Sequence, residues 1–210
     1  MTSTDCSAVA CAVSAMGSAR ARRLFALPTG LGRTQRPSVA ILQRIGSAEI
    51  QPAIRQLASA IARRHPAQPP ILVGIANGGT TLARRLAALI PGAPCGVIDV
   101  SFHRDDISHH PIPKELLPTQ IPVDVKGATV VLVDDVIFSG RTVKAALDEL
   151  FDQGRPAKVE LAVLVDRGGR KLPVTPDYFG LTLAAGDGHR VAVTLDPDDP
   201  EKDAIIVQTV

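Results

Sequence analysis

The sequence predicts an α/β fold in which helices flank a largely parallel central sheet. Short, β-branched aliphatic runs alternate along the chain with stretches whose apolar residues recur at helical spacing. The 17 Gly and 17 Pro supply turns between these elements, and aromatic residues make up only 3% of the 210 residues, so the core must be aliphatic. No apolar run approaches the roughly 18 to 20 residues of a membrane-spanning helix, which argues against an integral membrane protein.

The first half of the predicted domain contains a helix, a strand, a turn and a second helix. The first helix should begin at Ser47 as N-cap and run to Arg64. Its inward face is expected to contain Ile50, Ile54, Leu57, Ala58 and Ile61. Residues 71–75 read as a buried strand, and residues 76–80 as a turn of small residues. A second helix over 81–90 should place Leu82, Leu86 and Leu89 inward.

The second half repeats the alternation of strands and helices. A strand is expected at 96–101, and a long stretch over 102–122 shows no clear period. Such stretches are usually mobile functional loops or hairpins, and we expect this one to close over the site. The strongest strand, 129–133, runs directly into Asp134 and Asp135. A helix over 142–151 and a further aliphatic strand over 159–165 follow.

Charge and cysteine content limit the possible partners. The chain has 23 basic and 21 acidic residues, a net charge of +2. Residues 1–40 account for +4 and leave the rest of the chain at −2, so a nucleic-acid contact would have to be a local patch. Cys6, Cys11 and Cys95 lack metal-ligand spacing. Neither a disulfide framework nor a zinc site is therefore predicted, and a reducing cytoplasm is the expected compartment.

The sequence divides into an extension and one domain. Residues 1–38 contain many small residues and five Arg without a periodic apolar face, so we expect a poorly ordered extension there and a single domain over 39–210. Three interpretations of the extension compete: a solvated tail or over-long start, an organelle transit peptide, which is also Arg-rich and poor in acidic residues, and a secretory signal. The secretory signal is disfavoured because the first basic residues follow the apolar stretch instead of preceding it.

One sequence segment carries the clearest chemistry. Asp134 and Asp135 end a buried strand, and the run Ser139-Gly140-Arg141-Thr142 follows at the start of a helix. Hydroxyls and backbone N–H groups at the positive end of a helix dipole suit a phosphate monoester, and Gly140 permits a left-handed backbone. The carboxylates can accept hydrogen bonds from two ribose hydroxyls. A Walker A loop differs, because it has a lysine and no acid pair.

Because ligands bind at the carboxyl ends of parallel strands, residues 76–79, 134–142 and 166–170 should share one edge of the sheet. At 130–142 the sequence resembles the signature of phosphoribosyltransferases that use 5-phosphoribosyl-1-diphosphate. Further matches at 73–75, 102–106, 121–124 and above all 152–173 resemble the bifunctional pyrimidine-operon attenuator and uracil phosphoribosyltransferase family, PyrR. The resemblance extends from about residue 50 to the C-terminus and implies a type I phosphoribosyltransferase-like fold.

The resemblance implies that uracil and phosphoribosyl diphosphate give UMP and diphosphate, with Mg²⁺ bound mainly through the substrate and no dedicated metal ligands. It implies catalytic roles for Asp134, Asp135 and Arg104, with residues 166–170 and Phe179 around the base. The substrate-binding residues it implies are Asn77, Gly78, Gly79, Asp135, Val136, Ile137, Phe138, Ser139, Gly140, Arg141, Thr142, Val143, Arg167, Arg170 and Phe179. A homodimer or higher homo-oligomer is also implied.

The sequence departs from the family at two places. Gly78 stands where members often have an arginine that meets the diphosphate. The first helix of regulatory members presents Thr, Arg and His to an RNA leader, and here the candidate RNA-binding residues are Arg55, Ser59 and Arg63. Two alternatives stay open: a phosphoribosyltransferase for a purine or another base, and a non-catalytic, nucleotide-sensing RNA-binding regulator.

Overall fold

The structure, a computed structural model, describes residues 40–76, 78–100, 118–186 and 188–209. These residues belong to one compact unit, Ser38–Val210. The predictions for the extension over 1–38, for Asn77 and Arg104, and for the part of the closing loop over 102–117 lie outside the described residues.

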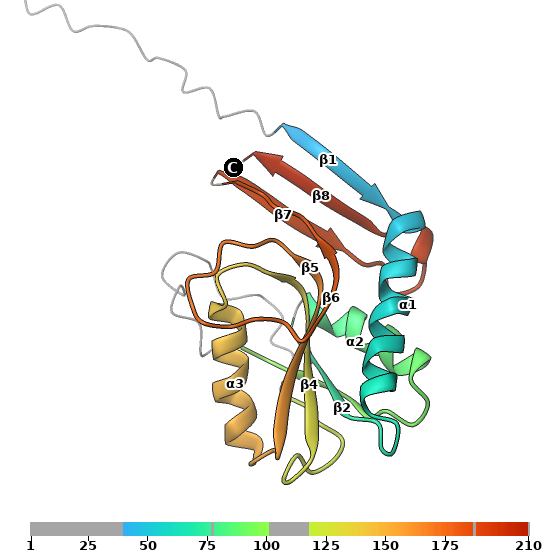
Figure 1. Cartoon of the computed structure of the whole chain (residues 1–210), viewed down its shortest axis with the longest axis vertical. Coiled ribbons are helices and arrows are strands. Elements are labelled where there is room, and N and C mark those ends of the chain that lie inside the picture. Colours follow the sequence, from blue (N-terminus) through green and yellow to red (C-terminus); the bar gives the residue numbers. More distant parts are fainter. Residues whose placement is uncertain (1–39, 77, 101–117, 187, 210) are drawn as a thin grey trace, which may run out of the picture. The chain divides into compact units, whose positions relative to one another are not determined.

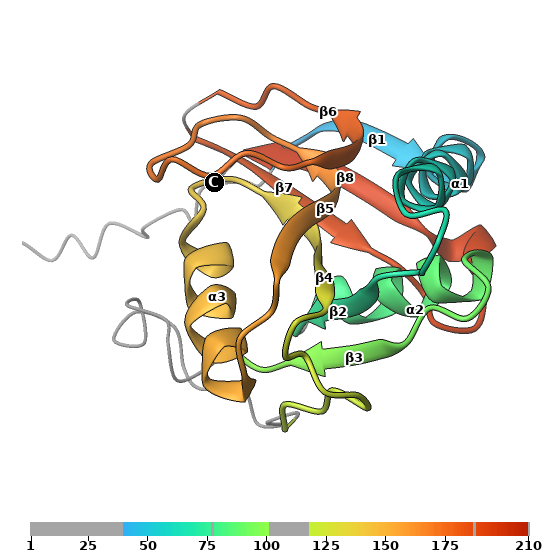
Figure 2. The same ribbon diagram turned by 60° about the horizontal axis from the view of Figure 1, so that its bottom comes forward.

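A five-stranded parallel sheet in the order β3-β2-β4-β5-β6 forms the centre of the unit. Its strands are β2 (Ile71–Ile75), β3 (Cys95–Ile98), β4 (Thr129–Ile137), β5 (Lys158–Asp166) and β6 (Tyr178–Thr182). Helices α1 (Ser47–Arg64) and α2 (Gly79–Leu89) cover one face, and α3 (Arg141–Gln153) covers the other (Figure 1; Figure 2). This arrangement confirms the predicted α/β fold.

Three further strands form a second, antiparallel sheet that the sequence analysis did not predict. It has the order β1-β8-β7 and comprises β1 (Ile41–Gly46), β7 (His189–Thr194) and β8 (Ala204–Thr209), with a short 3₁₀ helix, η1 (Pro200–Lys202), before β8. Strand β7 contacts β4 of the central sheet. The second sheet therefore contributes residues beside the carboxyl ends of the parallel strands.

Two apolar clusters, one on each face of the central sheet, make up the core. The predicted inward face of α1 is buried, with both Ile50 and Ile61 fully inaccessible. Two details of the prediction were wrong. Gly46, not Ser47, is the N-cap of α1, and no side chain caps it. Leu89 is 47% exposed, because Ile90 takes the inward position four residues after Leu86.

Glu160, near the start of β5, contacts residues at the C-terminal end of α1. Its buried carboxylate accepts a hydrogen bond from the Tyr178 hydroxyl at 2.7 Å and lies 2.7 Å from His65 Nε2. Lys158 Nζ at 2.6 Å and Arg64 Nε at 3.2 Å complete the cluster. Burial alone would raise the pKa of Glu160, but the hydrogen bonds from Lys158, Tyr178 and His65 outweigh it and lower the pKa to about 2.

None of the described helices is both long and apolar enough to cross a membrane.

Candidate active site

The first turn of α2 packs directly against β4 because three positions near it are glycine. A Cβ atom on Gly79 would lie 1.9 Å from the carbonyl oxygen of Val133, and one on Gly74 would lie 2.8 Å from the Cα of Thr80. Real Cβ atoms do not approach so closely, so any side chain at either position would separate the helix from the sheet. Thr80 is buried, and its hydroxyl makes no hydrogen bond within the described residues.

The carboxylate of Asp135 occupies the space beside Gly78. A Cβ atom on Gly78 would lie 2.4 to 2.6 Å from the three carboxyl atoms of Asp135. Strand β4 runs on through both acidic residues to Ile137, and Asp134 pairs with Val163 of β5. The glycine turn before α2 and the acid pair are therefore brought together, as the sequence predicted.

The two acidic side chains differ in environment. Asp134 is buried, and its Oδ1 accepts the backbone N–H of Asp135 at 3.0 Å. Asp135 is half-buried, and its Oδ1 accepts the N–H of Val136 at 2.7 Å. Burial raises the pKa of Asp135, and the hydrogen bonds from Val136 and Asp134 oppose this rise only in part. A partly desolvated carboxylate of this kind gains from hydroxyl donors or a cation on a ligand.

The loop between β4 and α3 has the predicted backbone geometry. Gly140 adopts a φ of 89°, the left-handed region that favours glycine, and α3 begins at the next residue. Ser139 Oγ accepts the N–H of Arg141 at 3.3 Å. Ile137 and Val143, both predicted to bind substrate, have buried side chains in the core, so only their main chain can face a ligand.

Arg170 and Arg167, which are predicted to bind substrate, both contact Phe138 of this loop. Arg170 donates to the carbonyl oxygens of Phe138 at 3.1 Å and Val174 at 3.1 Å, and it pairs with Asp166 at 2.9 Å. The guanidinium of Arg167 stacks 3.8 Å from the ring centroid of Phe138. Arg167 also donates to the carbonyl oxygen of His189 on β7 at 2.6 Å. Arg170 thus stabilises the loop, and Arg167 connects the loop to the second sheet.

A cavity of about 230 Å³ lies beside Asp135, and residues of both sheets line it. Gly78, Thr81 and Asp135 line one side, and Val193, Thr194 and Leu195 line the other. The last three residues were not predicted from the sequence, because β7 is a short, partly exposed strand without a strong apolar run. These residues form the second wall of an open cavity next to the Asp135 carboxylate.

Phe179, predicted to lie around the base, does not line this cavity. Phe179 pairs with Val163 in the middle of β5, whereas the edge of the sheet lies at Asp166 and Thr182. Its ring is 55% exposed and lines a separate hollow of about 450 Å³ against α1. That hollow also contains Ser59 and Arg63.

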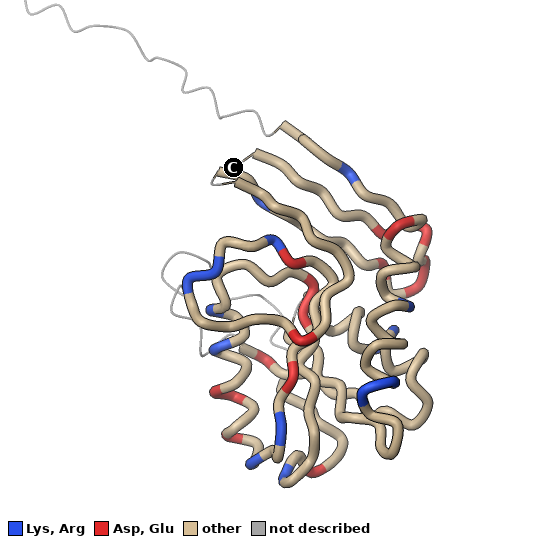
Figure 3. Tube along the Cα trace, in the orientation of Figure 1, with Lys and Arg blue, Asp and Glu red and all other residues tan. Residues whose placement is uncertain are grey.

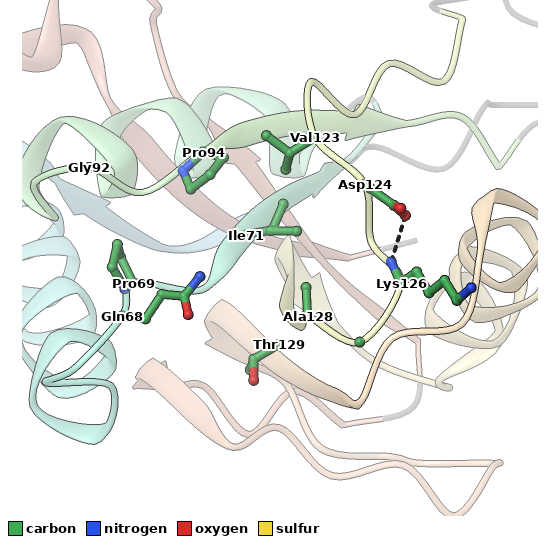
Figure 4. A pocket seen from close by; sticks show the side chains of 11 residues that line it. Gln68, Pro69, Ile71, Gly92, Pro94, Val123, Asp124, Lys126, Ala128 and Thr129 are labelled. Carbon is green, nitrogen blue, oxygen red and sulfur yellow. Dashed lines mark hydrogen bonds between the residues drawn. The ribbon is translucent and has the colours of Figure 1, made fainter.

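The candidate RNA-binding residues share one exposed face of α1. Arg55, Ser59 and Arg63 follow one another at intervals of four residues, and all three are exposed. Figure 3 shows the basic segment at the C-terminal end of α1, where Arg63 and Arg64 form the last turn. A further cavity of about 560 Å³ opens at the opposite end of the parallel strands, around Ile71 and Thr129 (Figure 4), and it contains no predicted site residue.

A glycine turn, an acid pair and the loop around Gly140 lie together at the carboxyl ends of the parallel sheet, and the chain belongs to the phosphoribosyltransferases. The model of the phosphoribosyl transferase domain family matches residues 46–196. Among solved structures, the hypoxanthine-guanine phosphoribosyltransferase of Bacillus anthracis superposes with a TM-score of 0.60 at 22% identity, covering 80% of this chain and 99% of that one. The hypoxanthine phosphoribosyltransferase of Trypanosoma cruzi superposes with a TM-score of 0.56 at 22% identity, covering 81% and 97%.

Two curated relatives indicate to which family of phosphoribosyltransferases the chain belongs. The bifunctional protein PyrR of Chloroflexus aurantiacus is 40% identical over 172 residues, covering 79% of this chain and 94% of the relative. The bifunctional protein PyrR of Geobacter sp. is 44% identical over 141 residues, covering 65% and 80%. The chain belongs to the PyrR family of phosphoribosyltransferases.

Proposed function

We propose that the chain transfers the phosphoribosyl group of phosphoribosyl diphosphate to uracil, forming UMP and diphosphate. The observation that carries this proposal is the cavity beside Asp135, which has the glycine turn on one side and the end of β7 on the other. The membership of the PyrR family favours uracil as the base. The structural relatives act on purines, but at 22% identity they support only the fold.

Each side of the site suits one part of the two substrates. The main chain at 139–142, at the N-terminus of α3, would bind the 5-phosphate. Asp134 and Asp135 would accept hydrogen bonds from the ribose hydroxyls, and the N-terminus of α2 after Gly78 would face the diphosphate. The base would then lie toward residues 193–195. This arrangement holds the ribose and the base together without a covalent intermediate.

Magnesium fits the same site. Carboxylate oxygens are ligands that Mg²⁺ prefers, and the ion is usually held by one or two carboxylates together with substrate phosphates. Asp135 presents a half-buried carboxylate beside Gly78, next to the proposed position of the ribose. When bound, Mg²⁺ would neutralise charge on the departing diphosphate. Asp134 and Asp135 would hold the ribose, directly or through water bound to the ion.

We further propose a second role, binding of an RNA leader through α1 in a manner that depends on UMP. The exposed row of Arg55, Ser59 and Arg63 supports it, because the domain as a whole carries no excess of positive charge. A regulator that binds UMP without forming it is the alternative from a different functional class.

The test is an assay of nucleotide formation by the purified full chain with phosphoribosyl diphosphate and Mg²⁺. Uracil, hypoxanthine and guanine are supplied in parallel, and UMP should be the main product. Formation of IMP or GMP at a higher rate would replace uracil with a purine as the substrate. Tight UMP binding without any turnover would favour the sensor.

A further inference from the structure

A buried ion pair connects α2 to the segment that leads into β8. Asp203 is 2% exposed, and both of its carboxylate oxygens contact the guanidinium of Arg85 on α2, with Nη2 to Oδ1 at 3.1 Å. Gln51 of α1 donates a further hydrogen bond to Asp203 Oδ2 at 2.7 Å. Three elements from different parts of the chain therefore meet at one carboxylate.

The same pair holds both backbone polar groups of Asp196. The N–H of Asp196 donates to Asp203 Oδ1 at 3.0 Å, and its carbonyl oxygen accepts a hydrogen bond from Arg85 Nη2. The Asp196 side chain in turn accepts the N–H groups of Asp198 at 3.0 Å and Asp199 at 2.9 Å. The position of residue 196 is thus fixed relative to α2.

Residue 196 directly follows one wall of the cavity, and Arg85 lies one turn after the other wall. Val193, Thr194 and Leu195 form the first wall, and Thr81, four residues before Arg85, belongs to the second. The guanidinium therefore connects the two walls through a single side chain. A change in its geometry would alter the width of the cavity without touching the acid pair.

A buried ion pair is a weak device for stability, because the cost of desolvating two charges offsets much of their attraction. The planar fork of arginine, in contrast, fixes several acceptors in one geometry. We propose that Arg85 is a positioning residue that sets the distance between residues 193–195 and the ribose side of the site, and thereby the fit of the base. This inference rests on the proposed function.

The experiment compares Arg85→Gln and Arg85→Lys with the control Arg84→Gln, which changes the neighbouring, exposed arginine of the same helix. Calorimetry gives the Kd of UMP and of ribose 5-phosphate, which lacks the base, and steady-state kinetics gives the KM of uracil and of phosphoribosyl diphosphate. Arg85→Gln should raise the Kd of UMP and the KM of uracil by about tenfold or more, since small misplacements of a binding wall are costly. Binding of ribose 5-phosphate should stay near the wild-type value.

Arg85→Lys keeps the charge opposite Asp203 but loses the fork, so it should show a smaller rise with the same selectivity for the base. This variant also serves if Arg85→Gln fails to fold. Equal losses for UMP and ribose 5-phosphate, or no loss for either, would overturn the proposal. If the wild-type chain binds IMP and not UMP, the proposed substrate is wrong, and the same comparison of IMP with ribose 5-phosphate tests the positioning role.

Discussion

A methyl group at position 78 should displace Asp135 and slow turnover. In Gly78→Ala the new Cβ would meet the carboxyl atoms of Asp135 at 2.4 to 2.6 Å, well inside the 3.4 Å of ordinary contact. The backbone at Gly78 has a φ of −73° and a ψ of −44°, which alanine adopts without strain. The fold should therefore persist, and the Asp135 side chain should rotate and lose its 2.7 Å hydrogen bond from Val136.

The size of the effect follows from what Asp135 would contribute to ribose binding. A hydrogen bond to a charged group is worth roughly 1.5 to 3 kcal/mol, which corresponds to a fall of about 10- to 100-fold in kcat/KM. The assay is the initial rate of UMP formation at varied phosphoribosyl diphosphate. Gly46→Ala is the matched control, because a Cβ there meets nothing within 4 Å.

Gly78→Arg tests the same contact from the other direction. From sequence alone, an arginine at 78 would be expected to strengthen diphosphate binding, as in family members with a cation there. The structure shows that its Cβ would meet the same conflict with Asp135, so slower turnover is expected here too. Wild-type rates in both variants, with the fold intact, would refute the placement of Asp135 beside Gly78.

Two further predictions concern the surface and the buried charge cluster. Replacing Arg55 and Arg63 with Ala should weaken RNA binding and reduce the slope of log affinity against log salt by about 1.4 per subunit, since two phosphate contacts to single-stranded RNA are lost. The rate of UMP formation should be unchanged. If RNA binding is lost only when residues 1–38 are deleted, the prediction is contradicted. Glu160→Gln should lower the free energy of unfolding at pH 7 by roughly 1.5 to 3 kcal/mol, because the buried Tyr178 and the largely buried His65 lose a charged hydrogen-bond acceptor. The pKa of Glu160 is lowered to about 2 in the folded chain, so its contribution is present above pH 4.5 and is lost as the pH falls toward 2. Urea unfolding at pH 7 and pH 3 should therefore show a smaller pH dependence in Glu160→Gln than in the control Asp152→Asn, which changes an exposed carboxylate; equal pH dependence would contradict the assignment.

The central sheet was predictable because its strands are buried on both faces and read as continuous apolar runs. Val130 to Val133 are all buried, and the acid pair and Gly140 follow them at fixed spacing. The second sheet was not predictable, because β1, β7 and β8 are short and in part exposed. Its residues enter the site only through tertiary packing.

The contacts of individual site residues also depend on tertiary packing. The distance of Phe179 from the sheet edge depends on the register of β6 against β5, which no local pattern specifies. Arg170 looked available for substrate because the carbonyl groups it contacts belong to a loop more than 30 residues earlier in the chain. A charged residue in a motif indicates a site, but its interaction partners depend on the fold.

The most direct measurement is the initial rate of UMP formation from uracil, phosphoribosyl diphosphate and Mg²⁺ by the purified full chain and by the variant that carries both Asp134→Asn and Asp135→Asn. Asparagine keeps the size of each side chain and removes the charge that would hold the ribose and Mg²⁺. We expect UMP formation by the wild type and its loss in the variant, with the thermal unfolding midpoint little changed. Wild-type turnover in a folded variant would contradict the assigned site.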